Sequence, residues 1–163
     1  MCGIVTIISK NKLYERLFNK LKKKNFHRGP DKISTLFRSN YKILFRRLSI
    51  IDLTNKGNQP YVNEKKTVDL VFNGEIYNYL ELREELKLEG INFKSRSDTE
   101  VVMKSYEFWG IKFVKKLKGM FSIIIFDNVK KKIIFLRDPL GQKPLYFSFI
   151  NKDLIVSSEI KDI

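Results

Sequence analysis

The 163-residue sequence predicts an α+β fold built from layered sheets. Candidate strands come in adjacent pairs near both ends of the chain, and the candidate helices lie mainly between these pairs. A parallel α/β sheet would instead show strands and helices in regular alternation. The length fits one domain, residues 1–163, with a single hydrophobic core.

The first part of the chain predicts a strand, a helix and a loop. Residues 3–9 are rich in isoleucine, valine and threonine, which is typical of a strand. An amphipathic helix is predicted next, because four apolar residues follow at helical spacing among lysines: Leu13, Leu17, Phe18 and Leu21. The segment "NFHRGPDK" (25–32) contains Gly-Pro and is predicted to be a loop.

A hairpin and a long loop are predicted to follow. "ISTLFRS" (33–39) and "YKILFRRLSI" (41–50) are strand candidates that a short polar turn separates. "DLTNKGNQPYVNEKK" (52–66) contains several turn-forming residues and is predicted to be irregular. "VDLVFNGEIYN" (68–78) is predicted to be a strand that ends in an Asn-Gly turn.

Helices and two further strand pairs complete the chain. "YLELREELKLEG" (79–90) predicts a helix that Gly90 stops. Ser97 with Glu100 forms a capping-box pattern ahead of a second helix, and residues 111–119 predict a short third one. Paired strands are predicted within "MFSIIIFDNVKKKIIFLRD" and again within "KPLYFSFINKDLIVSSEI".

Composition excludes several classes of function. The net charge of +14 suggests nucleic acid, but the lysines are spread along the chain, without zinc-finger spacing or an RRM-type aromatic pattern. Nucleic acid is therefore not an expected partner. A basic nucleic-acid binder is the third hypothesis for this chain, and it would show a steep salt dependence of binding. No apolar run is long enough to cross a bilayer, and the N-terminus lacks the pattern of a signal peptide. A single cysteine excludes an internal disulfide, so we expect a cytoplasmic protein with no membrane partner.

The single cysteine stands at position 2, directly behind the initiator methionine. If Met1 is removed, which a small second residue permits, Cys2 carries both a thiol and a free α-amine. The pKa of an α-amine lies at about 7.7–8.0, so this group can act as general base for the thiol. The placement alone leaves open the alternative of a small buried residue in a first strand.

Three other stretches can serve the same chemistry. Asn73-Gly74, placed at a turn, can aim an amide side chain and a backbone N–H at one point, as an oxyanion hole requires. The guanidinium of Arg47 suits an α-carboxylate, and the carboxylate of Asp98 suits an α-ammonium. Taken singly, these residues also fit an ordinary turn, a surface charge and a helix N-cap.

Nine motifs span the chain in order: "MCGIVTI", "HRGPD", "RRLSIID", "GNQP", "VFNGEIYNYLELREEL", "SDTEVVMKSYEFWG", "LKGMFSIIIFD", "RDPLGQKPLYF" and "SSEIK". This series resembles the N-terminal glutaminase domain of glutamine-hydrolysing asparagine synthetases, which are class II, N-terminal-nucleophile amidotransferases. The resemblance implies one glutaminase domain over residues 1–163. It also implies a four-layer αββα fold, with two stacked antiparallel sheets between helical layers.

The resemblance further implies that L-glutamine is the substrate and ammonia the product. By motif, Cys2 is the nucleophile that forms a thioester, and Asn73 with Gly74 forms the oxyanion hole. The segment "HRGPD" resembles a loop that orders the site. His27, the only histidine, is not assigned as a base, although a Cys–His dyad is the rival mechanism.

The same resemblance implies a grip on the amino-acid end of glutamine. Arg47 is expected to bind the α-carboxylate and Asp98 the α-amino group. Glu75 is expected to line the pocket, and Ile50 to contribute backbone contacts. No metal and no cofactor is expected in this chain, because it has neither a phosphate-binding glycine loop nor a metal-ligand motif.

ATP and Mg²⁺ are expected only on a synthetase domain, which in the family follows "SSEIK" and has no counterpart within residues 1–163. The expected partner is therefore a synthetase domain or subunit that supplies the ammonia acceptor, an activated aspartate. The alternative function is a catalytically idle amidotransferase fragment that acts as an interaction or regulatory module.

Overall fold

The computed structural model describes residues 1–9 and 14–163. One group of strands comprises β1 (Gly3–Ile8), β2 (Lys32–Phe37), β3 (Tyr41–Arg47), β8 (Tyr146–Ile150) and β9 (Asp153–Ser157). The other comprises β4 (Tyr61–Val62), β5 (Val68–Ile76), β6 (Gly119–Asp127) and β7 (Lys132–Arg137). The α-helices are α1 (Tyr14–Lys24), α2 (Tyr79–Leu88) and α3 (Asp98–Trp109). Short 3-10 helices span Phe26–Arg28, Asn55–Gly57, Gly110–Lys116 and Ile160–Asp162.

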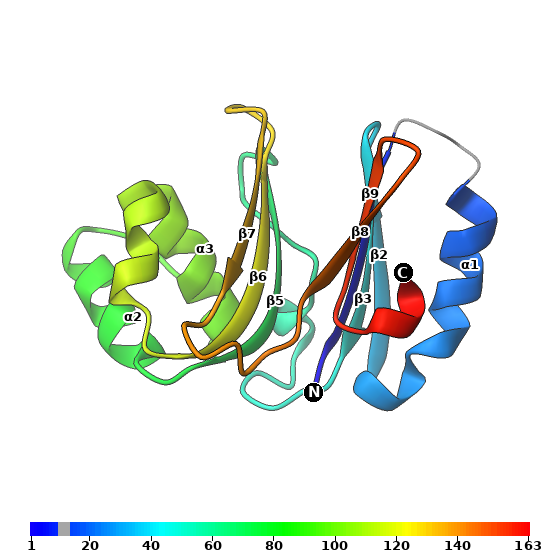
Figure 1. The fold of residues 1–163 in the computed structure, drawn as a ribbon. Coiled ribbons are helices and arrows are strands. Elements are labelled where there is room, and N and C mark those ends of the chain that lie inside the picture. Colours follow the sequence, from blue (N-terminus) through cyan, green and yellow to red (C-terminus); the bar gives the residue numbers. More distant parts are fainter. Residues whose placement is uncertain (10–13) are drawn as a thin grey trace.

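The two groups of strands form two antiparallel sheets that stack face to face. Their strand orders are β2-β3-β1-β9-β8 and β4-β5-β6-β7. Helix α1 covers the outer face of the first sheet, and α2 with α3 covers the outer face of the second (Figure 1). The expected four-layer αββα architecture is therefore confirmed.

Apolar residues fill all three spaces between the layers. Strand β1 shows this most clearly, because Ile4 packs between the sheets whereas Val5 and Ile7 pack against α1. Burial on both faces explains why its sequence is mainly apolar rather than alternating, and even the polar Thr6 within it is fully buried. Phe18 and Leu21 of the predicted amphipathic helix supply the matching face of α1. Leu13, also assigned to that face, lies outside the described residues.

Most of the predicted elements are confirmed, and a few details differ. Strand β4 was not predicted, because its two residues give no periodic signal. The helix predicted over residues 111–119 is a 3-10 segment over Gly110–Lys116. Ser97 caps α3 as expected, but the reciprocal half of the capping box is wrong. The Glu100 carboxylate instead accepts hydrogen bonds from the backbone N–H and the hydroxyl of Ser95, both at 2.6 Å.

The predicted Asn-Gly turn is also wrong, because β5 runs straight through Asn73 and Gly74. Gly74 pairs with Phe121 of β6 in regular register. A Cβ atom at position 74 would lie 2.1 Å from the Met120 carbonyl oxygen. The glycine therefore serves close approach of two backbones rather than a turn.

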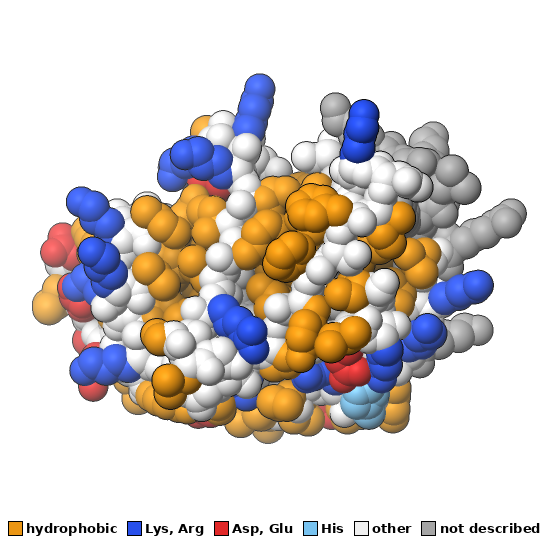
Figure 2. Space-filling view, in the orientation of Figure 1, with side chains coloured by type: hydrophobic (Ala, Val, Ile, Leu, Met, Phe, Trp, Pro, Cys, Tyr) orange, Lys and Arg blue, Asp and Glu red, His pale blue; other side chains and the backbone are white. Residues whose placement is uncertain are grey.

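An apolar groove opens where the edges of the two sheets separate, between β7 and β8. It is lined by Phe135, Leu136, Arg137, Leu145, Phe147, Phe149, Leu154 and Val156. Figure 2 shows hydrophobic side chains gathered across the middle of this face. Phe147 and Phe149 are 67% and 68% exposed, which is unusual for such large apolar side chains. Among the described residues, no helix is long and apolar enough to span a membrane.

Candidate active site

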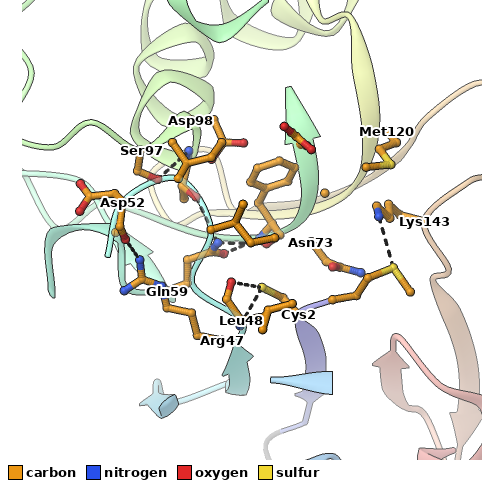
Figure 3. Close-up of a pocket in the computed structure, with 18 residues that line it drawn as sticks. Cys2, Arg47, Leu48, Asp52, Gln59, Asn73, Ser97, Asp98, Met120 and Lys143 are labelled. Carbon is orange, nitrogen blue, oxygen red and sulfur yellow. Dashed lines mark hydrogen bonds between the residues drawn. The ribbon is translucent and has the colours of Figure 1, made fainter. Parts of the chain in front are cut away.

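One pocket contains every residue that the motifs assign to the site. It is lined by Cys2, Arg47, Ile50, Asn73, Gly74, Glu75 and Asp98, together with residues that were not assigned. The pocket lies at the end of the sandwich where β1 begins, β3 ends and α3 begins (Figure 3). Both sheets and one helix therefore contribute to the site, and positions far apart in the sequence become neighbours.

Cys2 lies beside the end of strand β3. The pairing of Gly3 with Arg46 sets this position, and the Leu48 N–H donates to the Cys2 Sγ at 3.4 Å. Burial raises the pKa of the Cys2 thiol, while the Leu48 hydrogen bond, the positive N-terminus and Arg47 act in the opposite direction. Because the net shift is upward, the thiol needs a base to take its proton near neutral pH.

Asn73 presents a buried amide nitrogen that has no hydrogen-bond partner among the described residues. The residue is 2% exposed, and its Nδ2 is unpaired in the part of the chain that the structure describes. A buried N–H donor without a partner is rare, and it marks a position that a ligand oxygen can satisfy. Asn73 therefore meets the first requirement of an oxyanion hole, a preorganised donor that faces the pocket.

The backbone N–H of Gly74 can supply a second donor. The Phe72 N–H donates to Gln59 Oε1 at 2.6 Å, and the Ile76 N–H donates to Asp98 Oδ2 at 3.3 Å. Alternate residues of an antiparallel strand direct their N–H groups to the same edge. The Gly74 N–H therefore points to this edge as well, between the two occupied positions.

The guanidinium of Arg47 is held by the loop that follows β3. Its Nη1 donates to the Thr54 carbonyl and to Asn58 Oδ1, both at 2.8 Å, and its Nη2 donates to the Asp52 carbonyl. A Cβ atom at Gly57 would lie 2.6 Å from Nη2, so only glycine leaves room for this arrangement. The side chain, 7% exposed, is thereby fixed at the pocket wall.

Asp98 is a buried carboxylate at the first position of α3. It is 6% exposed, and within the described part of the chain no cation pairs with it. Burial raises the pKa of Asp98 from an ordinary value of 3.8 to about 6, with a further contribution from the negative charge of Glu75. An arriving ammonium group would reverse this effect, because it would stabilise the ionised carboxylate.

Several pocket residues were missed at the sequence level. Asp52, Gln59, Met120 and Lys143 all line the pocket. The motifs "RRLSIID", "GNQP", "LKGMFSIIIFD" and "RDPLGQKPLYF" contain them, but their residue types alone indicate no role. Lys143 is 7% exposed, and its Nζ lies 3.3 Å from the Sδ of Met1.

His27 does not belong to the pocket. Its Nε2 lies 2.6 Å from Glu159 Oε1, and its side chain is 54% exposed. The geometry therefore gives no support to a dyad of Cys2 with His27. Among the described residues there is also no cluster of side chains that could hold a metal ion.

Two proteins of Bacillus subtilis are similar to this chain in sequence. The sequence is 40% identical over 168 residues to asparagine synthetase [glutamine-hydrolyzing] 1 of Bacillus subtilis (strain 168), matching all of this chain but 26% of that protein. It is 45% identical over 137 residues to asparagine synthetase [glutamine-hydrolyzing] 2 of the same organism, which covers 84% of this chain and 18% of that protein. The chain thus spans about a quarter or less of the length of these relatives.

Solved structures agree at the level of the fold. The glutamine phosphoribosylpyrophosphate (PRPP) amidotransferase from B. subtilis, complexed with ADP and GMP, superposes with a TM-score of 0.77 at 19% identity, over 99% of this chain and 42% of that chain. A family model described as the glutamine amidotransferase domain matches residues 1–163. The chain therefore belongs to the glutamine amidotransferase domain family.

Proposed function

We propose that this domain hydrolyses the side-chain amide of L-glutamine to glutamate and ammonia through a thioester on Cys2. The observation that carries the proposal is the pocket itself, which brings an N-terminal cysteine beside an unpaired buried amide and a buried carboxylate without a cation. A nucleophile, an oxyanion donor and an ammonium acceptor are what this reaction requires.

The reaction begins with a proton transfer at the N-terminus. After removal of Met1, the neutral α-amine of Cys2 takes the thiol proton, and Sγ attacks the amide carbon. Asn73 Nδ2 and the Gly74 N–H donate to the resulting oxyanion. Collapse of this intermediate breaks the C–N bond, and the ammonium group of Cys2 gives its proton to the departing nitrogen, which leaves as ammonia. The regenerated α-amine then takes a proton from water as the water attacks the thioester. The C–S bond breaks, the proton returns to the thiol, and glutamate is released.

The opposite end of the pocket holds the part of glutamine that does not react. Arg47 donates to the α-carboxylate, and Asp98 accepts from the α-ammonium. Glu75 and Ile50 complete the wall around the amino-acid group. Binding at this end places the side-chain amide in front of Cys2, which converts the attack into an intramolecular step.

The relatives suggest where the ammonia goes. Because they are much longer and are named asparagine synthetases, we propose that this domain serves a synthetase domain or subunit that transfers ammonia to an activated aspartate. The ATP and Mg²⁺ that activate a carboxylate would bind there, and no residue described here is assigned to them. A cytoplasmic setting fits this role.

Purified protein without Met1, incubated with L-glutamine, tests the proposal by release of equimolar ammonia and glutamate. L-asparagine and D-glutamine are matched controls, because each misplaces either the amide or the α-amino group. Residues 1–163 alone should form no asparagine from aspartate, glutamine and Mg-ATP. Glutamine binding without any hydrolysis would favour the idle regulatory module instead.

Substitution of Arg47 or Asp98, the residues proposed to bind the amino-acid end of glutamine, is expected to weaken glutamine binding. Arg47→Lys and Asp98→Asn should raise KM for glutamine by about 30-fold or more, because truncating one partner of a buried charge pair costs about 2–5 kcal/mol. The value of kcat should change far less, since neither group touches the reacting carbonyl. Steady-state kinetics of ammonia release measures the split, and equal losses in kcat would contradict the assigned roles.

Glutamine binding is expected to weaken below pH 6. The ammonium group of the substrate requires ionised Asp98, whose pKa is about 6 in the free domain, so the dissociation constant should rise about 10-fold from pH 7 to pH 5. The raised pKa of Asp98 also affects folding. Protonation of Asp98 increases the free energy of unfolding of the free domain, and this increase is lost as pH rises through about 6. Calorimetry on Cys2→Ala removes the thiol from the measurement. In Asp98→Asn the binding should be weak and independent of pH over this range.

A further inference from the structure

Asp52 lies between Arg47 and Asp98, the two residues proposed to bind the amino-acid end of glutamine, but it has no role in the proposed reaction. It is 8% exposed and stands in the loop that follows β3. Its Oδ1 accepts hydrogen bonds from the N–H of Thr54 at 2.9 Å and from the hydroxyl of Thr54 at 2.6 Å. These contacts fold the loop back on itself, in the manner of an Asx turn.

The same loop fixes Arg47. The Asp52 carbonyl oxygen accepts from Arg47 Nη2, and the Thr54 carbonyl oxygen accepts from Nη1 at 2.8 Å. Both carbonyl groups belong to residues that the Asp52 side chain holds together. The orientation of the guanidinium therefore depends on the conformation that the Asp52 carboxylate imposes on the loop.

The other carboxylate oxygen of Asp52 contacts the segment that leads to Asp98. Its Oδ2 accepts from the Arg96 N–H at 3.0 Å, two residues before Asp98. Position 96 leads directly into the capped start of α3, where the Ser97 hydroxyl accepts from the Thr99 N–H at 3.1 Å. The Asp52 carboxylate thus ties the loop that carries the Arg47 contacts to the segment that places Asp98.

We infer that Asp52 is a positioning residue that sets the separation of Arg47 and Asp98 and so matches the pocket to the carboxylate and ammonium groups of an α-amino acid. The inference rests on the proposed function. An α-amino acid holds its two charged groups at a fixed distance, so two rigidly spaced partners bind it without a further cost of ordering. In this role Asp52 acts through Arg47 and Asp98 rather than on Cys2.

The ionisation of Asp52 is consistent with this role. Burial acts to raise the pKa of Asp52, but the hydrogen bonds from Thr54 and Arg96 and the positive charge of Arg47 outweigh it, and the net shift is downward. The group is therefore a carboxylate at neutral pH, with both oxygens available as acceptors. An amide at this position would offer one oxygen and would turn its NH₂ group toward one of the N–H donors.

The test measures binding of L-glutamine to the Cys2→Ala protein by calorimetry, which does not depend on turnover. Asp52→Asn should weaken binding about 10-fold or more, because it loses a hydrogen bond to a charged acceptor and turns its NH₂ group toward an N–H donor. Asp127→Asn is the matched control. Asp127 is also a buried carboxylate that holds a hydroxyl and a backbone N–H, from Tyr106 and Lys130, but it does not line the pocket.

Two further readouts separate positioning from general destabilisation. With Cys2 present, Asp52→Asn should leave kcat and the rate of Cys2 alkylation by iodoacetamide within about 2-fold of the unsubstituted protein. Thr54→Val is a milder variant in case Asp52→Asn fails to fold. It removes the hydroxyl contacts to Asp52 and to the Lys56 N–H, keeps the carbonyl contact to Arg47, and should weaken binding about 2–5-fold.

Each outcome decides the inference. Binding weakened in Asp52→Asn and Thr54→Val but retained in Asp127→Asn supports it. Equal affinity in all variants overturns the role of Asp52 while leaving the proposed function intact. A parallel fall in alkylation rate and kcat overturns it as well, because Asp52 would then act on Cys2. If no variant binds glutamine, including the Cys2→Ala parent, both the inference and the proposed function fail.

Discussion

Replacement of Cys2 by alanine is expected to abolish hydrolysis of glutamine, because no other described side chain in the pocket can form the thioester. Ammonia release in a coupled assay measures the loss, and calorimetry should show that glutamine still binds. A second change tests the amine rather than the thiol. A peptide fused ahead of Cys2 turns the α-amine into an amide, which cannot accept a proton, so activity should be lost although the thiol remains.

The contrast between these two variants is informative. Full activity in a protein with a blocked N-terminus would refute the amine as general base, even if Cys2 proved essential. Residual Met1 would have the same effect as the fused peptide, since the peptide bond from Met1 also holds the Cys2 nitrogen as an amide. The Met1 side chain also lines the pocket, beside Lys143. Mass measurement of the intact N-terminus must therefore accompany each assay.

Asn73→Ala is expected to lower kcat by about 10²–10³-fold, with a much smaller change in KM. The reason is that Nδ2 of Asn73, unpaired in the free domain, gains its partner when the carbonyl oxygen becomes an oxyanion. Steady-state kinetics on the purified variant measures both parameters. A rise in KM with unchanged kcat would show instead that Asn73 binds the ground state.

Asn78→Ala is a suitable control for Asn73→Ala. Asn78 is also a buried asparagine, but its side chain is fully engaged, donating to the Lys116 carbonyl and accepting from the Lys118 N–H, both at 2.9 Å. Its loss should lower the free energy of unfolding by about 1–3 kcal/mol and leave kcat nearly unchanged. Thermal unfolding of the two variants separates a catalytic effect from a structural one.

Much of the fold could be predicted because its signals are local. The hairpins β2–β3, β6–β7 and β8–β9 join strands that are adjacent in sequence, with polar turns between them. The pairing of β1 with β9 joins the two ends of the chain, and no local pattern reports it. The prediction of an Asn-Gly turn was wrong because glycine occurs both in turns and where two backbones approach closely. Only the position of β6 shows that Gly74 serves close backbone contact.

The residues of the site also fall into two groups, those that the sequence predicted and those that only the tertiary structure reveals. Cys2, Arg47 and Asp98 carry distinctive chemistry, and the motifs around them predicted that they would meet. Asp52 and Gln59 were missed because they bind backbone groups, Gln59 through both polar groups of Phe72, and only the tertiary structure reveals such contacts. The unpaired state of Asn73 likewise becomes visible only once its surroundings are known. The roles assigned to these residues remain predictions.

The most direct test of a nucleophilic N-terminal cysteine is covalent labelling. Protein from which Met1 has been removed is treated with a diazoketone analogue of glutamine, digested, and analysed by mass spectrometry of its N-terminal peptide. We expect one adduct on Cys2, slowed by excess L-glutamine and absent from Cys2→Ala. An adduct on another residue, or labelling of Cys2 at a rate that L-glutamine does not change, would contradict it.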